Sequence, residues 1–215
     1  MQTVFITGGT GYMGSRLIKT LQKEGDFQIT ALARKGSEHK LPAGCKLAVG
    51  NALDADSFSE SVKGCDIFIH LIGVAHPSPA KKEQFRNIDL VSICQSVKAA
   101  KQAGVNHFIY VSVAAYPTKI MLEYQQARAT GEVVLTTSGI PCTILRPWYV
   151  LGPGHWWPWL LKPLYKLAKW IPAYKEAASK LDTVTLQQMI AVLKKAVTEK
   201  NSGIKYYEVA DIKKY

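Results

Sequence analysis

Residues 7–14 read Thr7-Gly8-Gly9-Thr10-Gly11-Tyr12-Met13-Gly14, and they stand between a short apolar run and a helical pattern. The run at residues 4–7 is typical of a buried strand, and apolar residues recur at helical spacing from residue 13 to residue 21. Glycines permit a tight turn, and a helix N-terminus offers free N–H groups to an anion. A glycine-rich turn without a ligand is the alternative. The context favours a dinucleotide-binding loop, whose candidate contact residues are Gly8, Thr10, Gly11, Tyr12, Met13 and Gly14.

The alternation of strand and helix continues along the chain. Apolar runs typical of strands covered on both faces lie at residues 28–33, 46–49, 67–71, 108–112 and 142–145. Helical patterns separate them, the longest at residues 84–103 and 119–137. Repeated strand–helix–strand units predict an α/β fold with a doubly wound parallel sheet of the Rossmann type. Such a sheet binds its ligand at the carboxyl ends of the strands.

The sequence changes character after residue 150. All five tryptophans fall within residues 148–170, and helical patterns follow at residues 160–170 and 185–198. A short strand is expected near residues 206–209. We therefore expect residues 1–150 to form the dinucleotide-binding domain. Residues 151–215 are expected to form a small C-terminal helical cap packed on it, within a single structural unit.

Length and composition limit the class of protein. A chain of 215 residues with 47% hydrophobic and 20% charged residues is ordinary for a soluble globular domain. The four cysteines form no C-x-x-C pair and the histidines show no ligand spacing, so no metal site is expected. The sequence contains no run of 18 apolar residues, so no membrane-spanning helix is predicted, and residues 1–6 do not resemble a signal peptide. These features predict a cytoplasmic protein.

The net charge of +11 is compatible with an anionic ligand, nucleic acid or an anionic membrane. No motif that reads nucleic acid accompanies the charge, so nucleic acid is not expected. Residues 156–170 combine tryptophans with Lys162, Lys166 and Lys169 on one helix face, a pattern typical of helices in a membrane interface. A cap helix that closes an apolar substrate pocket explains the same pattern, and we favour it over peripheral membrane contact.

The end of the second predicted strand bears on the choice of cofactor. Folds that bind NAD carry an acidic residue about 20 residues after the glycine loop, where it bonds the adenosine ribose. Arg34 and Lys35 occupy that place, and the next acid is Glu38. A guanidinium suits a 2′-phosphate, so NADP is predicted over NAD. A solvated basic turn is the alternative.

Together these features resemble the short-chain dehydrogenase/reductase superfamily, specifically its atypical, regulator-like and epimerase-like branch of NAD(P)H-binding proteins. The resemblance covers roughly residues 1–155. Besides the glycine loop it rests on segments in the family's order, at residues 50–54, 71–73, 110–112, 127–132, 138–147 and 152–154. It implies that Asn51 reaches the adenine amino group through its side-chain oxygen. It also implies that further cofactor contacts come from Ala52, Leu53, Leu71, Ile72, Gly73, Arg128 and Pro147.

The resemblance also implies a catalytic group. The family's reductases carry a Tyr and a Lys four residues apart on one helix face, with a Ser nearby. That Lys binds the nicotinamide ribose and lowers the pKa of the Tyr, which exchanges a proton with the substrate oxygen. The corresponding candidates are Tyr124, Arg128 and Ser112. An arginine keeps the charge but does not release a proton, and Val113 stands where a second hydroxyl is usual. A packing role for Tyr124 is the alternative.

Two functions follow from these residues. The first is an NADPH-dependent oxidoreductase that passes hydride to an apolar carbonyl or quinone in a tryptophan-lined pocket. The second is a non-catalytic NADP(H)-binding redox sensor or assembly subunit, which the departures at Arg128 and Val113 favour. A nucleotide-sugar epimerase would need a substrate domain larger than residues 150–215. The resemblance further allows a homodimer through the helices at residues 84–103 and 119–137.

Overall fold

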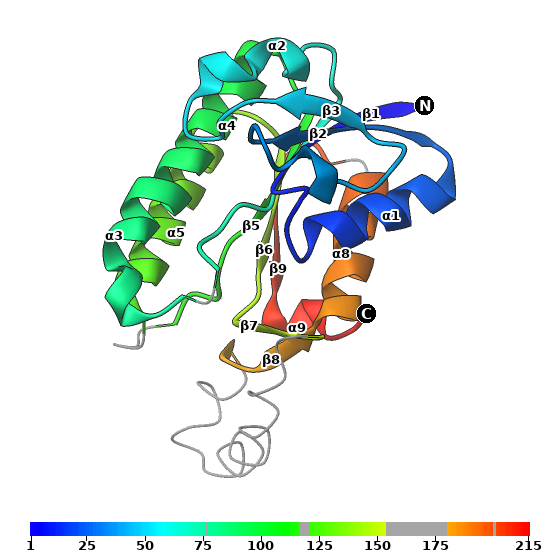
Figure 1. The fold of residues 1–215 in the computed structure, drawn as a ribbon. Helices are drawn as coiled ribbons and strands as arrows, with labels where there is room; N and C mark the ends of the chain where they lie inside the picture. Colours follow the sequence, from blue (N-terminus) through cyan, green and yellow to red (C-terminus); the bar gives the residue numbers. More distant parts are fainter. Residues whose placement is uncertain (76, 117–120, 154–179, 200) are drawn as a thin grey trace, which may run out of the picture.

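The computed structural model describes residues 1–75, 77–116, 121–153, 180–199 and 201–215. Within these ranges the centre of the fold is a seven-stranded parallel sheet with the order β3-β2-β1-β4-β5-β6-β9 (Figure 1). Its strands are β1 (Gln2–Thr7), β2 (Phe27–Ala33), β3 (Lys46–Val49), β4 (Ile67–His70), β5 (His107–Val111), β6 (Cys142–Arg146) and β9 (Ile204–Glu208). Two short strands, β7 (Tyr149–Leu151) and β8 (Thr183–Thr185), pair separately.

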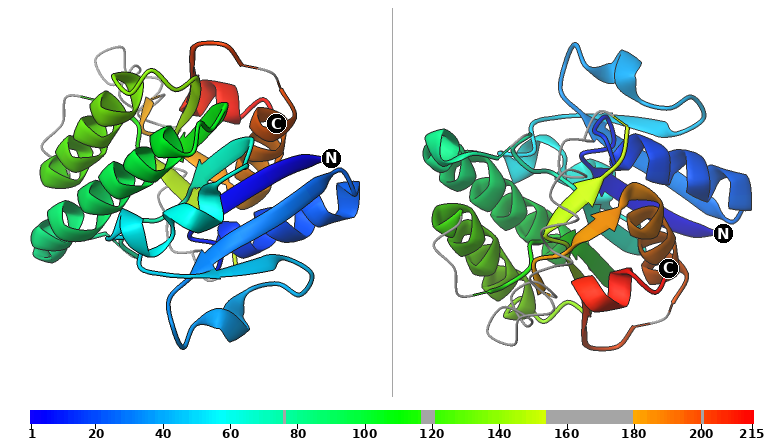
Figure 2. Two further views of the ribbon diagram at one scale, coloured as in Figure 1. Left: turned by 90° about the horizontal axis from the view of Figure 1, so that it is seen from above. Right: turned by 90° about the horizontal axis from the view of Figure 1, so that it is seen from below.

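Helices cover both faces of this sheet. On one face α1 (Gly14–Glu24) contacts α8 (Leu186–Thr198), and on the other lie α4 (Val91–Gln102) and α5 (Leu122–Thr136), as the views in Figures 1 and 2 agree. The shorter helices are α2 (Ser59–Val62), α3 (Lys82–Gln84), α9 (Val209–Ile212), three 3₁₀ turns (Glu38–Lys40, Ala55–Ser57 and Pro79–Lys81) and a π-helix (Phe85–Leu90). None of the helices in the described ranges has the length and apolar character needed to cross a bilayer.

Alternate side chains of each strand enter two apolar cores. Val4 and Ile6 of β1 belong to the core under α1 and α8, whereas Phe5 between them belongs to the core under α4 and α5. In the second core, Phe68 and Phe108 of neighbouring strands stack with ring centroids 4.9 Å apart. Burial on both faces explains why the strands read as near-continuous apolar runs. The predicted strands are all present, with bounds shifted by two residues or fewer, and the doubly wound fold class is confirmed.

The described part of the predicted C-terminal cap differs from that expectation. β9 pairs in parallel with β6, from Cys142↔Ile204 to Arg146↔Glu208, so it extends the main sheet. α8 starts with a capping box between Thr185 and Gln188, and its apolar face enters the core under α1. The reason is that β6, α8 and β9 form a further strand–helix–strand crossover, which packs back onto the sheet. The predicted helix at residues 160–170 and the tryptophan-rich segment lie outside the described residues.

The long helix predicted at residues 84–103 is present in the structure and contains a π-helical segment. α3, the π-helix and α4 follow one another without a break, so residues 82–102 are helical with a wider turn near their start. The buried residues of that wider turn are Phe85 and Asp89. A π-turn shifts the face that the following residues present, and such turns are frequent at functional sites.

Candidate functional site

The carboxyl ends of the parallel strands open into two adjoining cavities. The first, which we call the Ser112 cavity, measures about 330 Å³ and is lined by the glycine loop, the ends of β4 and β5, and residues 147–150. The second, the Arg34 cavity, measures about 670 Å³ and is lined by the glycine loop, the end of β2 and residues 50–53. Gly8, Gly11 and residues 71–75 line both. An extended ligand lying along residues 71–75 would therefore reach from one cavity into the other.

The glycine loop is closed tightly against β4. Gly8 has φ +79°, and a Cβ at this position would stand 2.9 Å from the carbonyl carbon of Leu71. A Cβ on Gly14 would collide with the carbonyl oxygen of Gly8, which also accepts a hydrogen bond from the N–H of Gly11 at 3.0 Å. Only glycine permits this approach. Thr10 lines the Arg34 cavity, and Tyr12, Met13 and Gly14 at the start of α1 line the Ser112 cavity.

Among the described residues, the charged ones that line the Arg34 cavity are basic: Arg34, Lys40 and Lys81. Lys35, predicted together with Arg34, is exposed and lines neither cavity. Sequence reasoning missed Lys40, which a turn brings back to the cavity. In that turn the N–H of Ser37 donates to the Arg34 carbonyl at 2.9 Å, and the N–H of Lys40 donates to the Ser37 carbonyl at 3.1 Å. The Arg34 cavity thus offers positive charge to an anionic ligand.

Residues 51–53 form the opposite rim of the Arg34 cavity. The side-chain oxygen of Asn51 accepts a hydrogen bond from the N–H of Leu53 at 3.1 Å, and the N–H of Asn51 donates to the Ser57 hydroxyl at 2.9 Å. These bonds fix Asn51 in a turn and leave one lone pair on its side-chain oxygen, since a carbonyl oxygen has two. Asn51, Ala52 and Leu53 all line the cavity.

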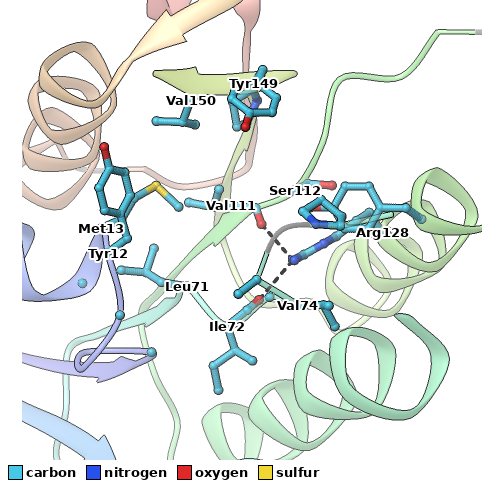
Figure 3. Close-up of a pocket in the computed structure, with 18 of the residues that line it drawn as sticks. Tyr12, Met13, Leu71, Ile72, Val74, Val111, Ser112, Arg128, Tyr149 and Val150 are labelled. Atoms are coloured by element: carbon cyan, nitrogen blue, oxygen red, sulfur yellow. Dashed lines mark hydrogen bonds between the residues drawn. The ribbon is translucent and has the colours of Figure 1, made fainter. Parts of the chain in front are cut away.

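Ser112 follows β5 and lies in the wall of the Ser112 cavity (Figure 3). Only 3% of the residue is exposed. Its N–H donates to the Leu145 carbonyl at 2.8 Å, but its hydroxyl has no hydrogen-bond partner among the described residues. A buried hydroxyl without a partner is unfavourable, because it has lost its hydrogen bonds to water. A ligand oxygen that accepts from this hydroxyl would replace such a bond.

Tyr124 lies in the first turn of α5 and also lines the Ser112 cavity. Its ring contacts that of Phe85 at a centroid distance of 5.1 Å, and the guanidinium carbon of Arg128 lies 5.2 Å from its centroid. The four-residue spacing therefore places Tyr124 and Arg128 on one helix face, as predicted. The structure brings all three predicted catalytic candidates, Ser112, Tyr124 and Arg128, to the same cavity.

Arg128 is 3% exposed and is held on several sides. Its Nη2 lies 2.5 Å from Oδ1 of Asp89, and its Nη1 donates to the carbonyls of Ile72 at 3.2 Å and Val111 at 3.1 Å (Figure 3). Burial lowers the pKa of Arg128, but the nearby Tyr124, Tyr110 and Asp89 together raise it by a larger amount, so the net shift is upward. The guanidinium stays charged, and its hydrogen bonds join the ends of β4 and β5 to α5 and the π-helix.

Asp89 is the most important site residue that sequence reasoning missed. It is fully buried in the π-helix, and its Oδ1 also accepts from the N–H of Val74 at 3.3 Å. Burial raises the pKa of the Asp89 carboxyl above its ordinary value, and the positive charge of Arg128 and the Val74 N–H offset only part of this rise. At 2.5 Å from a guanidinium that does not deprotonate, the carboxylate form is the one the site favours.

Two buried histidines, His70 and His107, are structural, and His107 lies at the start of β5, away from both cavities. His70 is completely buried, and burial, together with the nearby charge of Arg128, lowers its pKa to about 3. Burial also lowers the pKa of His107 to about 4, and its Nε2 lies 2.9 Å from the Thr143 hydroxyl. Both rings are neutral at physiological pH and carry no proton to the cavities. No group of three or more His, Cys, Asp and Glu side chains in the described ranges is arranged to hold a metal.

The remaining walls of the Ser112 cavity are mostly apolar. The predicted residues Leu71, Ile72, Gly73 and Pro147 line it. Sequence reasoning did not select residues 74–75, Pro77 or residues 148–150, which also line it. These residues directly follow the selected motifs, so their place in the chain was the available signal. The cavity therefore carries the polar side chains of Ser112 and Tyr124, together with those of Tyr12, Tyr149 and Arg128, in a mostly apolar wall.

A protein-family model described as NAD(P)H-binding matches residues 8–152. The chain belongs to this NAD(P)H-binding family. It is therefore a Rossmann protein whose family binds a nicotinamide dinucleotide, as the glycine loop predicted.

Individual relatives agree with this assignment. The chain is 29% identical over 153 residues to the uncharacterized sugar epimerase YhfK of Bacillus subtilis, covering 67% of this chain and 70% of that one. It is 27% identical to ceramide reductase of Caulobacter vibrioides, covering 70% of this chain and about half, 47%, of the longer protein. The fold is similar to that of the Bordetella bronchiseptica enzyme WbmH in complex with NAD⁺, with a TM-score of 0.72, 19% identity, and coverage of 97% and 75% of the two chains.

Proposed function

We propose that this protein is an NADP(H)-dependent oxidoreductase that passes hydride between the nicotinamide and an apolar carbonyl compound or quinone. The observation that carries the proposal is that Ser112 and Tyr124 line one cavity beside the glycine loop. A buried hydroxyl without a protein partner can bond a carbonyl oxygen, and a phenol can give that oxygen a proton. The two groups come from different elements, so the fold assembles them there.

The residues present fit a dinucleotide. The glycine loop leaves a cradle that a Cβ at Gly8 or Gly14 would fill, which allows close approach of a pyrophosphate to the backbone. Residues 71–75 connect the two cavities, so the adenosine half would occupy the Arg34 cavity and the nicotinamide half the Ser112 cavity. Asn51 keeps a lone pair for the adenine amino group.

NADP is the form of the cofactor that the charges favour. Arg34 and Lys40 both line the Arg34 cavity, where the described residues contribute basic and no acidic side chains. A 2′-phosphate brings additional negative charge to that place, and charge-assisted hydrogen bonds to a guanidinium are among the strongest available. An NAD-specific site would carry an acidic residue there to bond the ribose.

In the reaction the bound cofactor supplies the hydride to the carbonyl carbon. Ser112 donates a hydrogen bond that holds the carbonyl oxygen, and Tyr124 gives that oxygen its proton, so that a carbonyl becomes an alcohol. The guanidinium of Arg128, 5.2 Å from the Tyr124 ring, stabilises the phenolate that remains. Arg128 does not move a proton itself.

The mostly apolar wall of the Ser112 cavity supports an apolar substrate. Met13, Val74 and Trp148 are among its lining residues, so much of its wall is apolar. The similarity to ceramide reductase, whose name denotes a lipid substrate, agrees with this substrate class.

The test is transfer of deuterium from NADPH labelled at one face of nicotinamide C4 to a panel of apolar aldehydes, ketones and quinones. We expect deuterium in a reduced product. We also expect Tyr124→Phe to abolish turnover but to keep its affinity for NADPH, measured by the change in nicotinamide fluorescence on binding. Full turnover by Tyr124→Phe would contradict the proposed proton donor. Deuterium transfer to no member of the panel would contradict the oxidoreductase proposal.

A second candidate is a non-catalytic NADP(H)-binding redox sensor or assembly subunit. The observation that favours it is the ion pair between Arg128 and Asp89, which uses the charge that the family's reductases direct at the nicotinamide ribose. This function predicts tight cofactor binding, no turnover, and a protein partner whose affinity differs between NADPH and NADP⁺. Binding without deuterium transfer would favour it over the first proposal.

A further inference from the structure

Two hydrogen bonds hold the backbone on either side of Gly73. On one side, Nη1 of Arg128 donates to the carbonyl of Ile72 at 3.2 Å. On the other, the N–H of Val74 donates to Oδ1 of Asp89 at 3.3 Å. The two side chains are joined to each other at 2.5 Å. The backbone from residue 72 to residue 74 and the ion pair therefore form one closed ring of bonds.

Gly73 also packs directly on the ion pair. A Cβ on Gly73 would collide with Nη2 of Arg128 and would stand 3.3 Å from Oδ1 of Asp89. Gly73 and its neighbours line both the Ser112 cavity and the Arg34 cavity. The segment that connects the cavities thus rests on a guanidinium and a carboxylate (Figure 3 shows the bond from Arg128 to Ile72).

A buried ion pair stabilises its surroundings only when further hydrogen bonds satisfy its remaining atoms. Here the carbonyls of Ile72 and Val111 and the N–H of Val74 supply some of these bonds, whereas Oδ2 of Asp89 and Nε of Arg128 have no hydrogen-bond partner among the described residues. The three backbone groups come from the ends of β4 and β5, which are the strand ends that face the cavities. The ion pair is therefore built into the backbone of the site.

We propose that Asp89 is a positioning residue for the dinucleotide. It holds Arg128 against the backbone of residues 72–74, so that the segment keeps one conformation along both cavities. This inference rests on the proposed cofactor site. Arg128 then acts on the cofactor through the backbone of Ile72 and Gly73, in place of a direct bond to the ribose.

A direct bond from Arg128 to the cofactor predicts the opposite behaviour. In that arrangement Asp89 would compete with the ribose for the guanidinium, and removing its charge would strengthen binding. In the positioning arrangement, removing the charge releases the guanidinium and loosens residues 72–74, which weakens binding. The sign of the change in affinity therefore separates the two arrangements.

The experiment compares NADPH affinity, measured by nicotinamide fluorescence, in the natural protein and in Asp89→Asn. We expect about a tenfold weaker affinity, within the range of couplings between residues in one network. Adenosine 2′,5′-bisphosphate, which probes only the Arg34 cavity, should lose less, because Arg34, Lys40 and residues 51–53 also line that cavity and lie outside the ring of bonds. A variant that is merely less folded would lose affinity for both ligands equally, and that result would overturn the proposal.

Glu132→Gln is the matched control. Glu132 is also a buried carboxylate paired with an arginine, 2.5 Å from Arg146, and it lies on α5 one turn after Arg128. It lines neither the Ser112 cavity nor the Arg34 cavity. We expect this variant to lose stability while it binds NADPH as the natural protein does. An equal loss of affinity in Glu132→Gln and Asp89→Asn would overturn the special role of Asp89.

A second test uses Gly73 and serves where Asp89→Asn does not fold. Gly73→Ala places a methyl group against the guanidinium, so it should weaken NADPH binding in the natural background. In an Arg128→Ala background the same methyl group has room, so it should weaken binding no further. Equal effects of Gly73→Ala in both backgrounds would overturn the proposal.

The outcomes also separate this inference from the proposed function. Unchanged or tighter NADPH binding by Asp89→Asn overturns the positioning role and leaves the cofactor site in place. Failure of the natural protein to bind any nicotinamide dinucleotide overturns both.

Discussion

The hydroxyl of Thr7 lies 2.9 Å from Nδ1 of His70, between the last residues of the paired strands β1 and β4. Both residues are completely buried. The hydroxyls of Ser96 and Ser92 on α4 lie 3.0 Å from Nδ1 and 3.4 Å from Nε2. The imidazole therefore links two central strands to the helix that covers them. A neutral ring serves this role, because it can both donate and accept hydrogen bonds.

His70 makes the stability of the fold depend on pH. The pKa of His70 is about 3 in the folded protein against 6.5 for an unperturbed ring, so between these values the unfolded chain binds the additional proton. The stability that the neutral ring contributes is complete above pH 6.5 and is lost as pH falls toward 3. Between pH 6.5 and about pH 5, the loss from this residue is about 2 kcal/mol. Urea unfolding over this pH range measures it.

Two variants check that assignment. His70→Gln should give a shallower dependence of unfolding free energy on pH, whatever its stability at pH 7. His107, whose pKa is lowered to about 4, should account for much of the dependence that remains, and His107→Gln should remove it. An unchanged slope in His70→Gln would show that the ring has the same pKa in the folded and the unfolded protein, which would contradict this assignment.

The glycine loop and the strands could be predicted because their signals are local. A strand, a glycine cluster and a helical pattern are contiguous in residues 4–21, and burial on both faces leaves a direct mark on each strand. The turn at Gly25, which ends α1 with φ +77°, is equally local.

Asp89 could not be predicted, because its role depends on a residue 39 positions away. In a helical pattern a charged residue is typical of the solvent-facing side, and the π-turn that brings Asp89 inward leaves no clear mark in composition. For the same reason Lys35 was predicted as a cofactor contact and Lys40 was missed, since the turn after Arg34 decides which lysine lines the cavity. Likewise, the pairing of β9 with β6 is a tertiary contact that a short strand pattern does not reveal.

Gly8→Ala should abolish dinucleotide binding, and Gly25→Ala should not. Both glycines have φ near +78°, at +79° and +77°, so both substitutions strain the backbone by about 1 kcal/mol. Only at Gly8 would the new Cβ also press on β4, 2.9 Å from the carbonyl carbon of Leu71, whereas nothing lies within 4 Å at Gly25. Thermal unfolding and NADPH titration of both variants measure the difference. Equal behaviour would show that the loop can yield at Gly8 without loss of the cradle.

Arg34→Ala and Lys40→Ala should each weaken NADPH binding by about tenfold, as the loss of one charge-assisted hydrogen bond predicts. NADH binding should change little, because NADH lacks the 2′-phosphate. Lys35→Ala is the matched control, since Lys35 is a neighbouring exposed base that lines neither cavity. Parallel titrations with both cofactors give the ratio of affinities. If Arg34→Ala lowers both affinities equally, the 2′-phosphate does not bind at this side chain.

Ser112→Ala should separate function from stability. The hydroxyl has no partner among the described residues, so replacing it with a methyl group removes a buried polar atom and should leave the unfolding free energy unchanged or slightly higher. The same change removes the donor that we assign to the substrate oxygen, and the loss of such a donor lowers kcat by about a hundredfold. NADPH affinity should stay within about twofold, because the hydroxyl acts on the substrate. A clear loss of stability would instead place a hidden partner at Ser112, and the hydroxyl would then belong to the fold.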